Sequence, residues 1–154
     1  MTRSYGIIIY RAFEGKTEVL LCHPGGPYWK CKKNFTVSKG ERTGYEKAID
    51  TAKREFKEET SFNAPSNIHY LGTKKVNKKK LVTIFYANMD IDVEKCHSNT
   101  FKLESPKGSG IIKKYPEMDY YKWFSLDDAR KVIMKSQIYF INKLEDKLKE
   151  MKAW

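Results

Sequence analysis

Five charged side chains stand at fixed intervals within residues 40–62, and their types and spacing suit chemistry on phosphates. They are Glu46, Arg54, Glu55, Glu58 and Glu59. On a helix, residues three and four apart are neighbours, so Glu55, Glu58 and Glu59 would share one face. Carboxylate oxygens are ligands that Mg²⁺ accepts, and a bound ion stabilises the charge that builds when water attacks phosphorus. The pattern therefore predicts a divalent metal site for diphosphate hydrolysis.

This arrangement of glutamates is unfavourable in a helix that binds nothing. Like charges at these spacings cost about 0.2–0.5 kcal/mol per pair. The acidic cluster also lies in the last turn, where the helix dipole is already negative. A divalent cation would reverse both penalties. The alternative is a solvated acidic face, but we favour the metal site because violations of local rules concentrate at functional sites.

The residues before the glutamates predict the helix that carries them. Thr43 followed by Glu46 fits a capping box, which predicts a helix from near Gly44 to about Thr60. Its buried stripe would consist of Tyr45, Ile49, Ala52 and Phe56. Gly40 fits a loop that brings the backbone close to an ion, since it has no Cβ.

This segment resembles the signature of the Nudix hydrolases, which cleave diphosphate bonds in nucleoside diphosphates linked to another group. The resemblance implies that Glu58 and Glu59 are the main Mg²⁺ or Mn²⁺ ligands. Glu55 would be either a third ligand or the base that deprotonates the attacking water. Arg54 would hold Glu55 in position, and Glu46 would brace the loop before the helix.

The resemblance also assigns roles to that loop and marks one departure. A backbone carbonyl at Lys39 or Gly40 would complete the metal coordination. From its charge and its place beside the metal loop, and not from the resemblance, the Lys39 ammonium is a candidate to neutralise a distal phosphate. Ser61 stands where the signature has glycine. A serine in the left-handed conformation at this helix end costs on the order of 1 kcal/mol, unless Asn63 takes the turn instead.

A narrower resemblance covers almost the whole chain. It is to a branch of small predicted nucleotide pyrophosphohydrolases similar to diadenosine polyphosphate hydrolases, and rests on residues 19–29, 38–41, 98–104 and 124–130. It implies that dinucleoside polyphosphates or nucleoside triphosphates are the substrates. Phe35 and Ser38 stand where the branch typically has Trp and Pro. Nudix enzymes for ADP-ribose tend to carry a downstream proline where this chain has Lys78, which lowers the rank of ADP-ribose.

Further substrate contacts follow from residue chemistry. Tyr28 and Trp29 lie in a Pro/Gly-rich loop and would stack a base, a contact worth about 1–3 kcal/mol, unless one packs on the sheet. Glu104 is a candidate fourth carboxylate or base, against the alternative of a solvated loop glutamate. Lys114 and Tyr115 are further candidates for phosphate and base contacts.

The rest of the chain alternates between the two element types. Strands are predicted at residues 4–11, 18–23, 35–37, 70–76, 81–89 and 119–124, with helices capped by Ser125 and Ser136. Residues 90–116 show little periodicity and predict a long loop, functional or mobile. Helices that follow and interrupt a mixed β-sheet predict an α/β fold, the Nudix-type α/β/α sandwich, as a single domain over residues 1–154.

The formal net charge is +11, from 30 Lys+Arg against 19 Asp+Glu. Such a charge favours polyanionic partners and steers them to the protein. Lysine clusters at residues 30–33, 74–75 and 78–80 leave an RNA-directed alternative open, either decapping or 5′ pyrophosphohydrolysis or RNA binding. The competing interpretation is a solvated basic surface, and an inositol polyphosphate is a third substrate option.

Composition also bears on location. The chain has no apolar run of about 18 residues, and its opening segment is too short and too strand-like for a signal peptide, which predicts no membrane association. Three cysteines, Cys22, Cys31 and Cys96, form an odd and unpatterned set that suggests a reducing interior, hence a cytoplasmic protein. Whether the protein is a monomer or a homodimer stays open.

Overall fold

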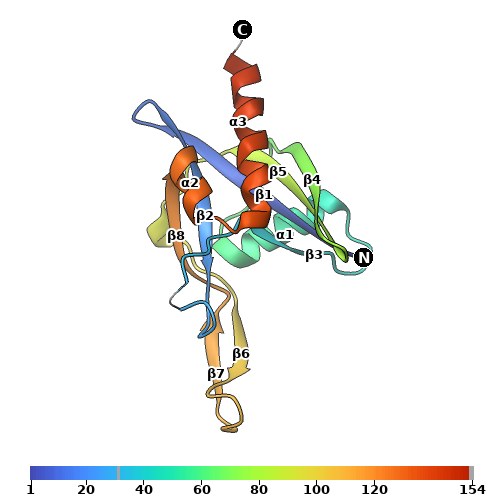
Figure 1. The fold of residues 1–154 in the computed structure, drawn as a ribbon, viewed down its shortest axis with the longest axis vertical. Helices are drawn as coiled ribbons and strands as arrows, with labels where there is room; N and C mark the ends of the chain where they lie inside the picture. Colours follow the sequence, from blue (N-terminus) through green and yellow to red (C-terminus); the bar gives the residue numbers. More distant parts are fainter. Residues whose placement is uncertain (31, 153–154) are drawn as a thin grey trace.

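The computed structural model describes residues 1–30 and 32–152, and its centre is a mixed β-sheet (Figure 1). The strand order is β4-β5-β1-β2-β8, and β3 pairs with β1 off this path. The strands are β1 (Thr2–Phe13), β2 (Lys16–Pro24), β3 (Ser38–Glu41), β4 (His69–Asn77), β5 (Lys80–Asn88) and β8 (Met118–Ser125). β1 runs parallel to β5, and the other pairs are antiparallel.

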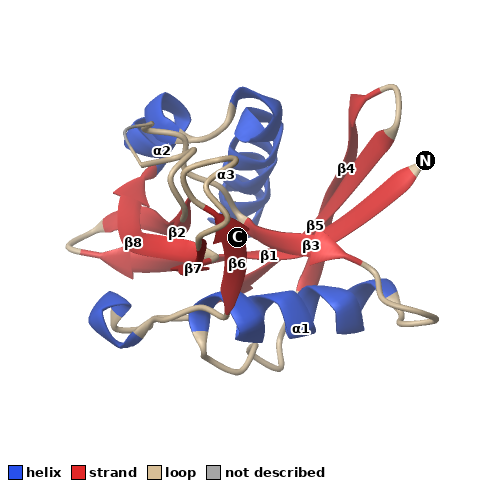
Figure 2. Ribbon diagram, turned by 90° about the horizontal axis from the view of Figure 1, so that it is seen from below, coloured by secondary structure: helices blue, strands red, loops and turns tan. Residues whose placement is uncertain are grey.

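Helices cover both faces of this sheet (Figure 2). α1 (Ala48–Thr60) lies on one face, and α2 (Leu126–Val132) and α3 (Ile138–Lys152) lie on the other. Successive side chains of a strand point to opposite faces, so Ile8 enters the core under α3 while Ile7 and Ile9 enter the core under α1. The predicted α/β/α sandwich with a mixed sheet is confirmed.

The strand predictions are confirmed with one shift. Residues 35–37 form only isolated bridges, Cys22 with Thr36 and Phe35 with Ile133, and the strand proper begins at Ser38. The reason is a side chain from far along the sequence. The Val37 N–H donates to Oε1 of Gln137 at 2.8 Å, where a ladder would have used a backbone carbonyl.

The predicted start of the first helix was wrong. α1 begins at Ala48 and not near Gly44, whose φ of 60° is left-handed. Glu46 Oε1 accepts the Thr43 N–H at 2.9 Å, which closes a turn ahead of the helix and not a capping box at its start. Tyr45, predicted to be buried, is fully exposed as a result. The predicted end of the helix is confirmed.

The C-terminal helices follow the prediction in part. Ser125 caps α2, because its side chain accepts the Asp128 N–H at 3.2 Å. Ser136 caps nothing: it lies in the 3₁₀ turn η2 (Lys135–Gln137), and α3 begins at Ile138. Met151, near the C-terminal end of α3, is exposed, whereas Ile141, Leu144 and Leu148 of the same helix are buried.

Residues 90–116 are more ordered than predicted. They contain the 3₁₀ turn η1 (Val93–Lys95) and a separate two-stranded sheet formed by β6 (Thr100–Glu104) and β7 (Ile112–Pro116), which projects from the body (Figure 1). The two strands of this hairpin show no alternation of apolar and polar residues in the sequence, because lysines stand on both of its faces.

Two remaining features concern cysteines and helix length. Cys22 and Cys96 are free thiols, and Cys31 lies outside the described residues. Among the described residues, no helix is both long and apolar enough to span a membrane.

Candidate active site

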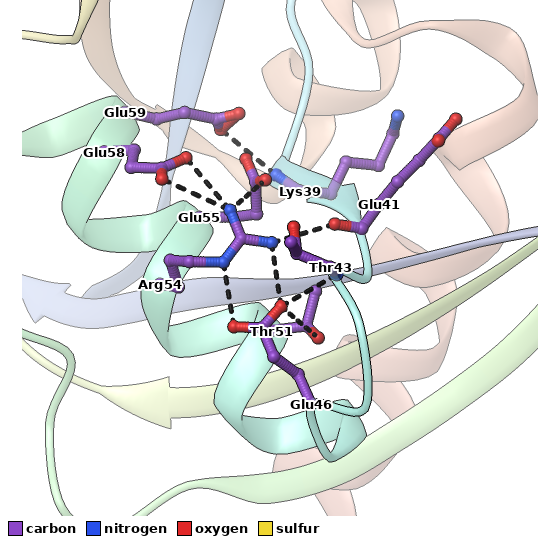
Figure 3. Close-up of polar contacts among 9 residues, drawn as sticks. All are labelled: Lys39, Glu41, Thr43, Glu46, Thr51, Arg54, Glu55, Glu58 and Glu59. Carbon is purple, nitrogen blue, oxygen red and sulfur yellow. Dashed lines mark hydrogen bonds and ion pairs between the residues drawn. The ribbon is translucent and has the colours of Figure 1, made fainter.

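α1 presents the predicted glutamates toward the loop that contains β3 (Figure 3). The side chains differ in exposure: Glu58 is 33% exposed and Glu55 13%, whereas Glu59 as a residue is only 3% exposed. The exposed fraction therefore decreases from Glu58 through Glu55 to Glu59, from the solvent edge to the core. We refer to Glu55, Glu58 and Glu59 as the carboxylate cluster.

Arg54 ties this cluster to the preceding loop. Its Nε donates to Glu46 at 2.9 Å, and its Nη1 donates to Glu55 at 2.9 Å and to Glu58 at 3.2 Å. Its Nη2 donates to the Glu41 carbonyl at 2.9 Å. The contact of Arg54 with Glu55 that the resemblance implied is thus present, and Figure 3 shows the guanidinium between the two groups of carboxylates. This guanidinium also lowers the pKa of Glu46 to about 2.

β3 contacts the carboxylate cluster directly, through Lys39 and Gly40. The Lys39 N–H donates to Glu59 Oε2 at 3.1 Å. Gly40 packs directly on Glu55, so closely that a Cβ at this position would lie 2.1 Å from the Glu55 carboxyl carbon. A contact this short excludes every other residue type unless Glu55 moves. Glycine at position 40 therefore lets the Glu55 carboxylate pack directly on the backbone of β3.

The electrostatics show an excess of negative charge. Burial raises the pKa of Glu59 well above its usual value, and the neighbouring Glu55 adds to the shift. Burial and the charge of Glu58 likewise raise the pKa of Glu55. Raised carboxyl pKa values mean that the ionised forms lack sufficient compensating charge.

A fourth carboxylate joins the cluster, and the sequence interpretation missed it. Glu117 follows β7 directly, and its pKa is raised by burial and by the charge of Glu58. It also contributes to the raised pKa of Glu55. No local spacing marks Glu117 in the sequence, because it reaches α1 only through the pairing of the hairpin and β8.

The chemistry of this donor set fits a divalent cation. Partly buried carboxylates with uncompensated charge are hard oxygen ligands of the kind that Mg²⁺ takes. As they are placed, no three His, Cys, Asp or Glu side chains of the described chain converge to hold an ion. The cause is Arg54, whose Nη1 lies between Glu55 and Glu58. An ion would have to displace this guanidinium from at least one of the two.

A positively charged cavity lies across the sheet from the cluster, on the face that α3 covers. It measures about 240 Å³ and is lined by residues that include Lys39, Lys80, Asn77 and Gln137. Burial and the charge of Lys80 lower the pKa of Lys39 to about 8. Because the Lys39 backbone holds Glu59 while its side chain lines the cavity, one residue links the carboxylates to a site that suits a phosphate.

The remaining predicted site residues lie elsewhere. Tyr28 and Trp29 stand in the loop after β2 and contact each other, with ring centroids 4.8 Å apart. Glu104, Lys114 and Tyr115 lie on the projecting hairpin, where Glu104 accepts the Gly108 N–H. In the described part of the chain, no hydrogen bond, ion pair or ring contact joins these five residues to the cluster.

A mixed sheet with a glutamate-bearing helix on one face is the architecture of the NUDIX domain. The chain belongs to this family, whose model, described as the NUDIX domain, matches residues 2–144. The family resemblance stated from the sequence is thereby confirmed. Family membership supports a pyrophosphohydrolase, and Nudix hydrolases generally use divalent cations.

Solved structures of the same fold agree. The NUDIX domain of Shewanella oneidensis NrtR complexed with ADP ribose has a TM-score of 0.70 and 15% identity, covering 96% of this chain and 88% of that one. A Caenorhabditis elegans Ap4A hydrolase has a TM-score of 0.68 and 21% identity, covering 97% and 99%. A mutT/nudix family protein from Listeria innocua has a TM-score of 0.65 and 16% identity, covering 99% and 96%. No curated protein matches the chain.

Proposed function

We propose that this protein is a Mg²⁺-dependent hydrolase of the diphosphate linkage of nucleotides, with dinucleoside polyphosphates or nucleoside triphosphates as substrates. The observation that carries the proposal is the carboxylate cluster held against β3 by the Lys39 N–H and by close packing on Gly40. The likeness to an Ap4A hydrolase over 97% of the chain supports the first substrate class. Mn²⁺ is expected to substitute for Mg²⁺.

The cavity lined by the Lys39 side chain supports the binding of substrate phosphates. Lys39 and Lys80 would bind phosphate oxygens there, since both line the cavity. The positioning of phosphates is a large part of catalysis at phosphorus, where the protein itself does little covalent chemistry.

The carboxylates have distinct proposed roles. Glu58 and Glu59 would hold the cation, with a backbone carbonyl of Lys39 or Gly40 as a further ligand. When bound, the cation would neutralise phosphate charge and lower the pKa of the attacking water. Glu55 would either join the ligands or accept the proton of that water, and its raised pKa suits a proton acceptor.

Arg54 and Glu117 complete the proposed site. Arg54 contacts Glu55 and Glu58 without reaching the cavity, so it is a positioning residue. Glu117 shares the electrostatic environment of both carboxylates. It takes over the part of fourth carboxylate that the sequence interpretation gave to Glu104, which lies on the projecting hairpin.

Substitution of the ligands tests the proposal. Glu58→Gln and Glu59→Gln should each lower turnover on the order of 100-fold, because stabilisation by the bound ion is worth several kcal/mol. Purified protein is assayed with Mg²⁺ and with Mn²⁺ against dinucleoside polyphosphates, nucleoside triphosphates and ADP-ribose, and product analysis locates the broken bond. Glu150→Gln, which removes a glutamate 71% exposed on α3, is the control. Equal activity in all three variants contradicts the assignment.

Glu55→Gln separates the two roles of Glu55. If Glu55 is the base, the rate stays low at saturating metal, because no substitute accepts the proton. If Glu55 is a ligand, excess metal restores part of the rate, because only the affinity for the ion is lost. A titration of Mg²⁺ at saturating substrate distinguishes the two outcomes.

A further inference from the structure

The hairpin formed by β6 and β7 is rooted beside the carboxylate cluster. We refer to residues 100–116 as the arm. Before the arm, the Asn99 N–H donates to the Glu58 carbonyl at 2.8 Å. After it, the Glu117 N–H donates to the Asn99 carbonyl at 2.9 Å. The arm projects from this root away from the sheet (Figure 1). A ligand that follows the arm inward therefore arrives at the candidate active site.

The charges of the arm are arranged unfavourably for the protein alone. The arm holds four lysines and one acidic residue, Glu104. Lys102 and Lys114 are directly opposite each other in the ladder, and both are exposed. Like charges at opposite positions destabilise a pair of strands, and an isolated two-stranded hairpin is at best marginally stable. A bound polyanion would relieve this repulsion.

The apolar groups of the arm narrow the choice of polyanion. Phe101 and Tyr115 form a cross-strand pair with ring centroids 5.9 Å apart. Phe101 also packs against Gly26, where a Cβ would lie 2.9 Å from its ring. Farther out, Leu103, Ile111 and Ile112 are exposed. Nucleic-acid-binding β-ribbons and wedges combine such lysines with aromatic and aliphatic side chains that contact bases.

We propose that the arm binds single-stranded RNA and directs its 5′ phosphates to the carboxylate cluster. Lys102 and Lys114 contact phosphates of the chain, and Ile112, exposed on the same face of the ladder, contacts a base. RNA with a 5′ triphosphate combines a long polyanion with the kind of phosphate bond that the proposed function cleaves. The delivery of this RNA to the cluster therefore rests on the proposed function. A second copy of the chain is disfavoured as occupant because each copy carries a net charge of +11.

Salt-dependent binding tests the arm directly. The experiment measures the dissociation constant of an unstructured RNA over a range of salt concentrations without added divalent ions. The RNA has about 12 nucleotides, which is within the site sizes of single-strand binders. Lys102→Ala/Lys114→Ala should lower the slope of log affinity against log salt by about 1.4, at about 0.7 per phosphate contact. At about 0.2 M salt this corresponds to about tenfold weaker binding.

Two matched variants separate charge from folding. Lys149→Ala/Lys152→Ala removes the same charge from α3 at the opposite end of the molecule and should leave the RNA slope unchanged (Figure 1). Lys102→Arg/Lys114→Arg keeps the arm charge and should keep the slope. The alanine variant of the arm is expected to unfold at the same temperature as the unmodified protein or higher, because it removes a like-charge pair.

The outcomes distinguish the arm from the hydrolase. An equal slope in the arm and α3 alanine variants overturns the proposal, as does binding of anionic lipid vesicles without binding of RNA. Because binding is measured without divalent ions, it does not depend on turnover. RNA that binds but releases no phosphate or diphosphate from a 5′ triphosphate when Mg²⁺ is added would overturn delivery of the 5′ end to the cluster. RNA binding by a protein that hydrolyses no nucleotide would refute the hydrolase and leave the arm, and nucleotide hydrolysis without RNA binding would refute the arm and leave the hydrolase.

Discussion

Each glutamate of the carboxylate cluster is held by a different group, and this difference bears on its role. Glu59 is buried and accepts the Lys39 N–H, so it is the most firmly placed. Glu55 is confined between Arg54 and Gly40. Glu58 is the most exposed of the three and bonds only the same guanidinium at 3.2 Å. Glu58 is therefore the side chain that can change position at least cost.

The first prediction concerns Lys39, whose pKa is lowered to about 8 by burial and by Lys80. A neutral amine binds phosphate poorly, so kcat/KM should fall above pH 8 by about tenfold per pH unit, since kcat/KM reports groups of the free enzyme. Lys39→Arg keeps the charge and should move this alkaline limb upward. A pH profile of both proteins measures the shift, and an unchanged limb in the arginine variant would exclude Lys39 as its origin.

The same shift has a consequence for stability. The pKa of Lys39 is lower in the folded protein than the ordinary value of 10.5, so between pH 8 and 10.5 the folded state binds fewer protons than the unfolded state. The contribution of this group to the free energy of unfolding therefore rises with pH across that window. Activity and stability should respond to Lys39 in opposite directions on the alkaline side.

At the residue scale the sequence predicts what is local. The spacing of Arg54, Glu55 and Glu58 on one helix could be read directly, and their contacts are present. Glu117 could not be predicted, because its approach to α1 depends on the pairing of strands far away in sequence. Glu104 had a suitable residue type in the correct segment, but the hairpin carries it away from the root.

At the element scale, side-chain hydrogen bonds explain where the element predictions fail. Gln137 bonds the Val37 N–H, which delays the start of β3 until Ser38. The Glu46 carboxylate is drawn to Arg54 and Thr43, which delays the start of α1. In the first case a hydrogen bond from a residue 100 positions away overrides the local pattern, and in the second case short-range bonds hold Glu46 in the turn ahead of the helix.

The end of α1 allows a stability prediction. Ser61 has φ 71° and ψ −4°, the left-handed conformation expected at this position, so it does not leave the turn to Asn63. Ser61→Gly should raise the free energy of unfolding by about 0.5–1 kcal/mol, because relief of left-handed strain exceeds the entropy that glycine adds to the unfolded chain. Chemical denaturation measures the change. Ser61→Ala keeps the strain, so a similar gain in that variant would show that conformation is not the cause.

At the scale of the whole molecule, the chain carries a net positive charge, while four glutamates with little compensating charge lie together beside α1. The net charge is +11, yet the pKa values of Glu55, Glu59 and Glu117 are all raised. The long-range positive field attracts polyanions. The local negative cluster repels them unless a cation intervenes. We therefore expect that substrate binding at the cluster depends on a bound cation.

The last prediction follows from this balance. The folded-state pKa of Glu59 is raised by burial and by Glu55. As the pH rises above 4.5, the ionisation of Glu59 therefore lowers the free energy of unfolding. At neutral pH with a chelator, Glu59→Gln should therefore unfold at a higher temperature than the unmodified protein. Mg²⁺ should stabilise the unmodified protein by up to about 2.7 kcal/mol at a hundredfold excess over its dissociation constant.

In Glu59→Gln most of that stabilisation by Mg²⁺ should be lost, because an amide is a poor ligand for a hard cation. Thermal unfolding in chelator and in Mg²⁺ gives both quantities without any assay of activity. Glu150→Gln on α3 serves as the control and should respond to Mg²⁺ as the unmodified protein does. A variant that is less stable in chelator and equally stabilised by Mg²⁺ would show that Glu59 supports the fold and not the ion, and the proposed metal site would then lose its most firmly placed ligand.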